Sequence, residues 1–186
     1  HGSGISKNFI KEVIKIECEE IIIVGGIINI NFDDPRIKVV ENISKSNAST
    51  NRNKGSEIAR ADYLLFVDKD VILNSEYINN NFIYKEIKYE VVYGIYKNFE
   101  YSNNFLDFFH NQITIKRSKD AKNFSSSHFL IKKETFKEIG KFNPYMESYE
   151  DIEFYNRLLK YNINLHFDET FYGTHLKKYT FSSAIK

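Results

Sequence analysis

The sequence has little of what marks a secreted or membrane-spanning protein. It contains one cysteine, Cys18, so no disulfide bond can form within the chain. No apolar run approaches the roughly 18 residues that a membrane-crossing helix needs, and no signal-peptide pattern opens the chain. From these features we expect a cytoplasmic protein without a transmembrane segment.

An excess of charge of one sign is also missing. Lys and Arg number 26 and Asp and Glu 25, so the formal net charge is +1, and nucleic acid is not expected as a partner. Hydrophobic residues make up 42% of the 186 residues, which suits one domain with a sizeable core. Because residues 1–4 resemble the remnant of an expression tag, we expect this domain to span residues 5–186.

The most informative stretch is an apolar run, residues 63–67, that ends at Asp68-Lys69-Asp70. Five consecutive apolar residues predict a strand that is buried on both faces, as in a parallel sheet. Ligands of open α/β sheets bind at the carboxyl ends of the strands, where alternate side chains point the same way. Asp68 and Asp70 would therefore suit a hard cation such as Mn²⁺ or Mg²⁺ bound to phosphates. The alternative interpretation is an ordinary solvated strand end.

Helical and strand patterns alternate along the rest of the chain. Helices are expected near residues 8–16, 51–61, 75–78, 134–139 and 150–159. Further strands are expected at residues 21–24, 37–40, 89–96, 127–131 and 163–167, and residues 171–175 follow the last of these strands. This succession predicts an α/β fold with a mainly parallel sheet flanked by helices. Residues 97–125 are interpreted as a long loop that contains a short helix.

The helix expected at residues 150–159 begins with two acidic residues, Glu150 and Asp151. The helix dipole and the free backbone N–H groups of a first turn stabilise ionised carboxylates, so position alone indicates ordinary helix-start residues. The apolar stripe of this helix is expected to comprise Ile152, Tyr155 and Leu159.

Three blocks of sequence carry a family resemblance. The first is residues 34–40 followed by Arg52-Asn53-Lys54-Gly55. The second is Asp68-Lys69-Asp70. The third is residues 139–143 followed by Glu150-Asp151 and Arg157-Leu158. In their order and spacing these blocks resemble the family 2 glycosyltransferases, which are inverting, nucleotide-sugar-dependent enzymes with a Rossmann-like GT-A fold.

The resemblance implies a reaction and a role for several residues. An acceptor hydroxyl would displace a nucleoside diphosphate from the anomeric carbon of a sugar. Asp68 and Asp70 would hold Mn²⁺ or Mg²⁺ against the diphosphate, with His175 as a third ligand, although a histidine there is otherwise an ordinary surface residue. Asp151 would accept the proton of the acceptor hydroxyl, and Glu150 would orient the acceptor or the base.

The same resemblance places Arg52, Asn53 and Lys54 near the nucleotide, where a cationic side chain could neutralise phosphate. Capping of the helix by Asn51 or Asn53 is the alternative role for this segment. The expected partners are a nucleoside-diphosphate sugar, with a UDP-sugar favoured, and a glycan or other hydroxyl acceptor. The product would belong to a surface glycan, and a homodimer is left open.

Two departures from the family pattern are evident. No strand precedes Ser6, so the family's first strand is missing. Three explanations stay open: the domain is truncated at its N-terminus, a partner chain fills the position of the strand, or another segment replaces it. Gly25-Gly26 stands where the family has an Asp-Asp-Gly-Ser-like segment. A degenerate or truncated, non-catalytic binding module is therefore an alternative. A haloacid-dehalogenase-like phosphatase is another, because the segment from Asp68 to Val71 formally matches the nucleophile motif of that class.

Overall fold

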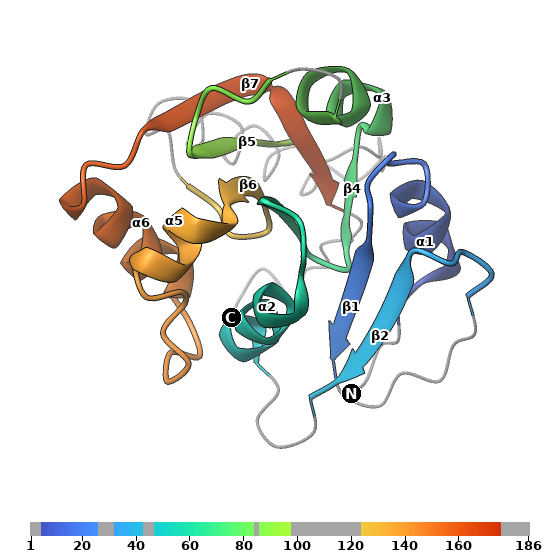
Figure 1. The fold of residues 1–186 in the computed structure, drawn as a ribbon, viewed down its shortest axis with the longest axis horizontal. Coiled ribbons are helices and arrows are strands. Elements are labelled where there is room, and N and C mark those ends of the chain that lie inside the picture. Colours follow the sequence, from blue (N-terminus) through green and yellow to red (C-terminus); the bar gives the residue numbers. More distant parts are fainter. Residues whose placement is uncertain (1–4, 26–31, 43–46, 84–85, 98–123, 176–186) are drawn as a thin grey trace, which may run out of the picture.

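The computed structural model describes residues 5–25, 32–42, 47–83, 86–97 and 124–175 (Figure 1). Its helices are α1 (Lys7–Val13), α2 (Ala48–Ile58), α3 (Ser75–Ile78) with a π-helical turn at Asn79–Ile83, α5 (Lys133–Glu138) and α6 (Glu150–Lys160). Its strands are β1 (Ile21–Gly25), β2 (Ile37–Glu41), β3 (Tyr63–Val67), β4 (Val71–Leu73), β5 (Val91–Lys97), β6 (His128–Lys132) and β7 (Leu165–His175). Most of the loop expected at residues 97–125 lies outside the described residues.

The strands form two sheets, and the larger one is mixed. Its order is β3-β6-β5-β7-β4, in which β6 runs antiparallel to both of its neighbours and β4 runs antiparallel to β7. The α/β class is confirmed, but the prediction of a mainly parallel sheet was wrong. Among the described strands, only β5 with β7 and β1 with β2 pair in parallel. A run of apolar residues reports burial on both faces and contains no information about strand direction.

The strand β7 is longer than the strand predicted at residues 163–167, because it continues through residues 171–175. It pairs with β5 along most of its length, and the register shifts between Tyr93 and Ile95. Gly94 lies at this irregularity, where a Cβ atom would overlap the backbone carbonyl of Phe171. The far end of β7 pairs with β4, a three-residue strand that the sequence pattern did not separate from β3. The glycine therefore permits the close approach of two central strands.

An aromatic core lies between the sheet and helices α5 and α6. Phe142 and Phe154 stack with ring centroids 4.4 Å apart, and Phe66 and Phe129 stack at 4.8 Å. Phe154 and Leu158 of α6 are fully buried, one helical turn apart.

The face of α6 that was expected to be buried is in fact partly exposed. Ile152 and Leu159 are 53% and 50% exposed, so the predicted stripe was wrong. The helix carries two adjacent apolar faces that meet near Tyr155, and helical periodicity alone does not say which one packs. The bulkier pair, Phe154 and Leu158, enters the core, because it completes the aromatic cluster.

The two-stranded sheet is attached to the larger sheet through side chains. Within the described residues β1 pairs only with β2, and β3 pairs only with β6, so each has one edge without a strand partner. Helix α2 packs on β1, with an ideal Cβ on Gly55 lying 3.3 Å from the Val24 side chain. Ile22 also packs against the aromatic core that contains Leu64.

Arg157 of α6 ties the helix to the turn that precedes the site. Its guanidinium donates hydrogen bonds to the backbone carbonyls of Ile139 and Lys141, and it pairs with Glu153. The turn needs this support because Lys141 has a φ of 59°, in the left-handed region that is unfavourable for a residue with a Cβ atom.

We expect Arg157→Lys to lower the free energy of unfolding by about 1–3 kcal/mol, because an ammonium group cannot reproduce the planar fork of donors. Urea unfolding measures the change. Arg60→Lys is the control, since the Arg60 side chain is 73% exposed, and its contribution should be close to zero. Equal losses in the two variants would contradict the role given to Arg157.

Candidate active site

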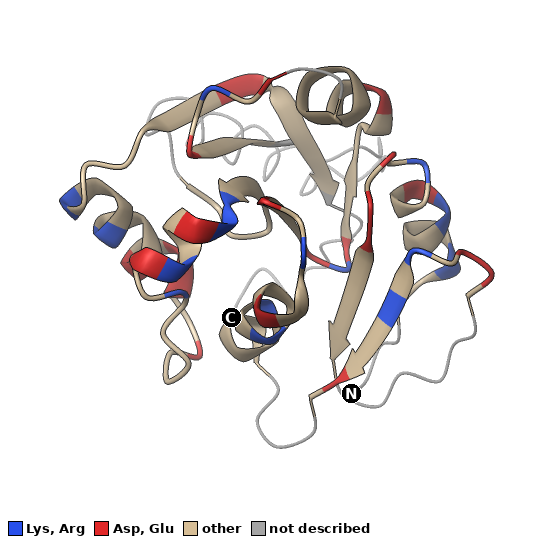
Figure 2. Ribbon diagram, in the orientation of Figure 1, with Lys and Arg blue, Asp and Glu red and all other residues tan. Residues whose placement is uncertain are grey.

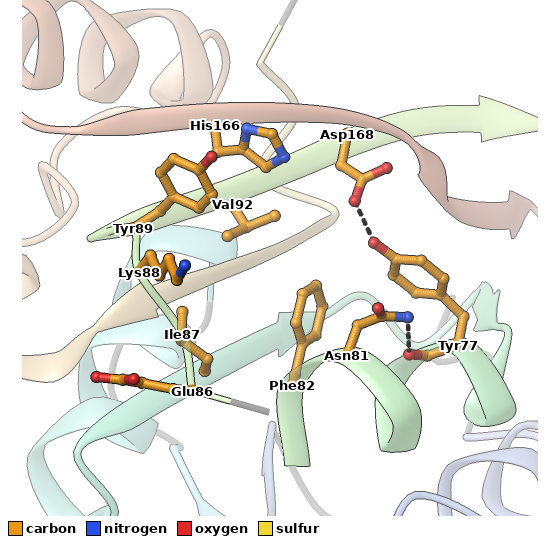
Figure 3. Close-up of a pocket in the computed structure, with 10 residues that line it drawn as sticks. All are labelled: Tyr77, Asn81, Phe82, Glu86, Ile87, Lys88, Tyr89, Val92, His166 and Asp168. Atoms are coloured by element: carbon orange, nitrogen blue, oxygen red, sulfur yellow. Dashed lines mark hydrogen bonds between the residues drawn. The ribbon is translucent and has the colours of Figure 1, made fainter. Parts of the chain in front are cut away.

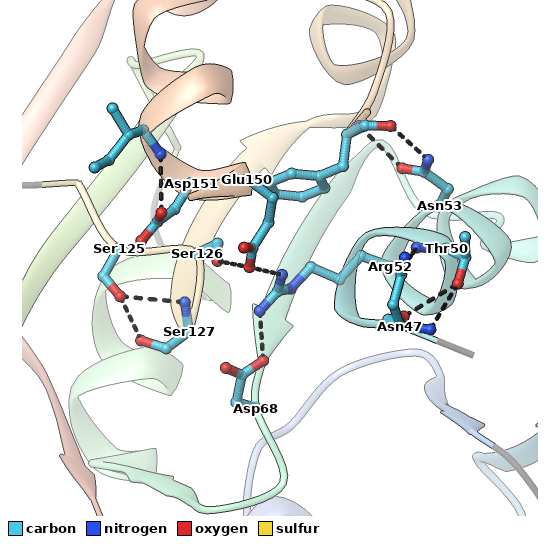
Figure 4. Close-up of polar contacts among 12 residues, drawn as sticks. Asn47, Thr50, Arg52, Asn53, Asp68, Ser125, Ser126, Ser127, Glu150 and Asp151 are labelled. Atoms are coloured by element: carbon cyan, nitrogen blue, oxygen red, sulfur yellow. Dashed lines mark hydrogen bonds and ion pairs between the residues drawn. The ribbon is translucent and has the colours of Figure 1, made fainter. Parts of the chain in front are cut away.

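The candidate site lies where the end of β3 meets the start of β6, helix α2 and the first turn of α6 (Figure 4). Asp68 follows β3 directly, and its backbone N–H donates to the carbonyl of Ser127, 2.8 Å away. The chain then turns, because the N–H of Val71 donates to the carbonyl of Asp68 at 3.0 Å. The turn presents Asp68 and Asp70 at the edge of the sheet, where both carboxylates remain partly exposed.

Arg52 is the central residue of this cluster. It comes from α2 and is only 8% exposed. Its Nη2 lies 2.7 Å from Oδ1 of Asp68, and its Nη1 lies 3.1 Å from Oε1 of Glu150. The guanidinium carbon also lies 5.2 Å from the ring centroid of Phe142. One cation thus joins the three sequence blocks that are far apart along the chain.

The two helix-start carboxylates have different surroundings. Glu150 is held by Arg52 and by the hydroxyl of Ser126, which donates to its Oε1 at 3.3 Å. Asp151 instead accepts a hydrogen bond from the N–H of Ile152 at 2.9 Å. Partial burial and the nearby charge of Glu150 raise the pKa of Asp151, despite that hydrogen bond. Asp151 is therefore the carboxylate more suited to accepting a proton.

The pKa of Asp68 is also changed by the surroundings of its carboxyl group. Desolvation raises the pKa of this carboxyl, and it outweighs the opposing effect of the Arg52 guanidinium. The charges of Asp70 and Glu150 add to the rise. Several carboxylates therefore gather around one arginine, an arrangement that a further cation would stabilise.

Figure 2 shows the acidic first turn of α6 and the basic residues of its last turn.

Asn53 and Asn47 fix the loop in front of α6. Asn53 donates to the carbonyl of Phe142 at 2.8 Å and accepts from its N–H at 3.0 Å. Asn47, not Asn51 or Asn53, caps α2, in a capping box with Thr50. The amide of Asn53 is thus engaged by the backbone, and the assignment of Asn53 to the nucleotide stays a prediction.

The two remaining predicted site residues are Lys54, expected near the nucleotide, and His175, expected as the third metal ligand. Lys54 is exposed on α2, and its contact with a nucleotide also stays a prediction. The register of β7 places His175 opposite Val71, immediately after Asp70 in the chain. Within the described residues no group of three His, Cys, Asp or Glu side chains forms a metal site. The structure places Asp68 and Asp70 in one turn, and their role as metal ligands stays a prediction.

Sequence reasoning missed the serines of this site. Ser125, Ser126 and Ser127 lie directly before β6, and Ser126 is 4% exposed. The hydroxyls of Ser125 and Ser127 lie 2.9 Å apart, and Ser126 reaches Glu150. Three consecutive serines before an apolar strand are the only signal in the sequence, and it does not identify their partner.

A hollow lies near the start of β5, at the opposite ends of the strands from Asp68 (Figure 3). His166 and Tyr89 stack there with ring centroids 4.1 Å apart, and the hydroxyl of Tyr77 donates to Asp168. Because β3 and β5 both run antiparallel to β6, they point the same way, and this hollow at the start of β5 lies away from Asp68. It does not form part of the candidate site.

An α/β domain that gathers these carboxylates and a buried arginine at the carboxyl end of a strand has the organisation of a GT-A-like glycosyltransferase domain. The comparisons agree with that class. A family model described as "Glycosyltransferase like family 2" matches residues 18–183, so the chain belongs to this family. The predicted GT-A-like fold and transferase family are thereby confirmed. No curated protein sequence gives a match.

Solved glycosyltransferase structures share the fold. TarS 1–349 of S. aureus has a TM-score of 0.65 and 16% identity over 92% of this chain and 58% of its own. The mannosyltransferase PcManGT of Pyrobaculum calidifontis, in complex with GDP-Man and Mn²⁺, has a TM-score of 0.64 and 10% sequence identity. The match covers 96% of this chain and 55% of PcManGT. The catalytic domain of Drosophila beta1,4galactosyltransferase 7 has a TM-score of 0.50 and 17% sequence identity. The match covers 76% of this chain and 57% of that domain. The chain therefore spans little more than half the length of these structures.

Proposed function

We propose that this domain transfers a sugar from a nucleoside-diphosphate sugar to an acceptor hydroxyl, with inversion at the anomeric carbon. The observation that carries the proposal is the cluster in which Arg52 joins Asp68 to Glu150 beside Asp151. Membership of glycosyltransferase-like family 2 supports it. A UDP-sugar is the favoured donor, and a GDP-sugar is the alternative, because PcManGT is described with GDP-Man.

The chain's own residues supply the proton transfer and the orientation. The acceptor oxygen forms a bond to the anomeric carbon while its proton passes to Asp151. The bond between that carbon and the diphosphate oxygen breaks, and its electron pair leaves with the nucleoside diphosphate. Attack from the face opposite the leaving group inverts the configuration. Arg52 and Ser126 hold Glu150, which orients the acceptor or the base.

Asp68 and Asp70 would hold Mn²⁺ or Mg²⁺, and His175 is the proposed third ligand. The two carboxylates fit such an ion, because hard cations take oxygen ligands and the raised pKa of Asp68 indicates a site where added positive charge is favourable. When bound, the ion would neutralise the charge that develops on the leaving diphosphate. Arg52, Asn53 and Lys54 are proposed to lie near the nucleotide, and Arg52 also pairs with Asp68 and Glu150.

The setting of the reaction is also proposed. The acceptor would be a glycan or another hydroxyl compound, and the product a surface glycan made on the cytoplasmic side. Among the described residues, no helix combines the length and the apolarity that crossing a bilayer requires.

A melting experiment tests the donor site. We expect UDP with Mn²⁺, but not either alone, to raise the melting temperature by about 5–10 °C at roughly 100 times the dissociation constant. GDP with Mn²⁺ is measured in parallel to identify the base. The Asp68→Asn/Asp70→Asn double variant should lose the rise, because it removes both proposed carboxylate ligands. Asp62→Asn, at an exposed position just before β3, is the control and should keep it.

Each outcome of this experiment is informative. A cooperative melt that neither nucleotide changes in the presence of Mn²⁺ would argue for a non-catalytic module. A rise that persists in the double variant would contradict the assignment of Asp68 and Asp70. A melting temperature that rises with GDP and Mn²⁺, but not with UDP and Mn²⁺, would show that the donor is a GDP-sugar.

A further inference from the structure

Two tyrosines project from the short loop that leads into α6. Tyr145 is 83% exposed and Tyr149 is 71% exposed, and the loop that carries them ends at Glu150 and Asp151. Ile152, in the first turn of α6, is 53% exposed. Isolated exposed apolar residues are ordinary, but here three large ones fall within eight positions of the chain, and the last of them is adjacent in sequence to the proposed base.

The loop that carries these tyrosines is fixed at several points. Asn47 donates to the carbonyl of Pro144 at 3.2 Å, and Asn53 makes both of its hydrogen bonds to the backbone of Phe142. The N–H of Tyr145 donates to Oδ1 of Asn143 at 3.0 Å. The tyrosines are therefore presented by an anchored segment, which lowers the entropy that a bound ligand would have to remove.

Tyr149 occupies a backbone conformation that does not favour tyrosine. Its φ is 61° and its ψ is 18°, in the left-handed region, where glycine is the residue with least strain. Its side chain makes no capping hydrogen bond, and its exposure means that little burial compensates for the strain. Neither local conformation nor folding accounts for a large aromatic side chain at this position.

We propose that Tyr145, Tyr149 and Ile152 form the surface that binds a carbohydrate acceptor. The inference rests on the proposed function and adds the chemical class of the acceptor. An aromatic ring offers an apolar face to the C–H groups of a sugar ring, and the phenolic hydroxyl offers a hydrogen bond to its hydroxyls. Because Tyr149 is two residues before Asp151, a sugar resting on this surface has its hydroxyls near the proposed base.

The proposal is specific to one end of α6, and the other end provides a matched control. Tyr161 follows the last turn of the same helix and is 56% exposed, but it lies more than two helical turns from Asp151. If the exposed tyrosines at the two ends of α6 only influenced solubility or stability, replacing Tyr149 or Tyr161 would leave glycan binding unchanged. If they bind the acceptor, only the residues at the start of the helix matter.

Glycan arrays carrying neutral and phosphate-bearing oligosaccharides provide the test, with labelled protein saturated with UDP and Mn²⁺. We expect wild type to bind, and Tyr145→Ala and Tyr149→Ala each to weaken binding at least about tenfold. Tyr161→Ala should match wild type, and Tyr149→Phe should retain most of the binding. Tyr149→Gly should raise the melting temperature while losing binding, a combination that a purely structural role for this side chain does not produce.

The outcomes separate this inference from the proposed function. Unchanged glycan binding in both alanine variants, or an equal loss in Tyr161→Ala, would overturn the acceptor surface. A wild-type protein that binds UDP and Mn²⁺ but no glycan would overturn it as well, and would leave the donor site intact. Failure to bind either nucleotide with Mn²⁺ in the melting experiment would instead overturn the proposed function.

Discussion

Asp151→Asn should reduce kcat for sugar transfer by about 100- to 10,000-fold, because an amide cannot accept the proton of the acceptor hydroxyl. The substitution keeps the size of the side chain and the oxygen that accepts from the N–H of Ile152. Nucleotide binding should therefore be unchanged, and the loss should appear in kcat. Quantifying the released nucleoside diphosphate at saturating donor measures it.

The raised pKa of Asp151 gives this prediction two further readouts. Since protonation removes the base, kcat/KM should fall as pH decreases through that pKa, and the fall should begin at higher pH than for an ordinary aspartate. The fold favours the protonated form, so at neutral pH the ionised group destabilises it, and Asp151→Asn should be at least as stable as wild type.

Glu134→Gln provides the control for this prediction, because the Glu134 side chain is 67% exposed and lies on α5. It should leave kcat and its pH dependence unchanged. Retention of wild-type kcat in Asp151→Asn would eliminate this residue as the base. A loss of activity accompanied by a lower melting temperature would point to a structural role instead.

Gly94→Ala should destabilise the fold by about 3 kcal/mol or more, the upper part of the range for overpacking. The new Cβ would overlap the backbone carbonyl of Phe171, and no rotamer change can remove a clash with backbone. Relief requires that β5 and β7 separate in the centre of the sheet. Urea unfolding followed by circular dichroism measures the loss.

Gly55→Ala is the matched control for the effect of a single added methyl group. Its Cβ would lie 3.3 Å from the methyl group of Val24, which can shift slightly. Gly55 is within helix α2, where alanine gains about 0.5–1 kcal/mol over glycine, so the net change should remain within about 1 kcal/mol. A Gly94→Ala protein as stable as wild type would contradict the close approach of the two strands.

Local patterns predicted most of the elements, because apolar runs and helix caps are encoded within a few residues. The Ser6 hydroxyl accepts a hydrogen bond from the N–H of Phe9 at the start of α1, and Gly140 follows α5 with a φ of 90°. Strand direction and the packed face of α6 depend on partners distant in sequence. The exposure of Ile152 and the antiparallel course of β6 could therefore be found only in three dimensions.

The candidate site was predictable in its members but not in its connections. Asp68 and Glu150 were selected separately, one as a metal ligand and the other as a positioning residue. Their shared partner, Arg52, had been assigned only to the nucleotide. A buried arginine between two carboxylates leaves no periodic signal in a sequence, and neither does the hydroxyl of Ser126 that completes the contact with Glu150.

The separation between the two sheets has a consequence for how the domain opens. No backbone ladder joins β1 to β3 in the described part of the chain, so the β1–β2 ribbon depends on α2 and on side-chain packing for its attachment. Units joined in this way open with a lower free energy than strands inside a continuous ladder. We therefore expect the ribbon to behave as a separate cooperative unit that can loosen while β3, with Asp68 at its end, stays folded in the five-stranded sheet.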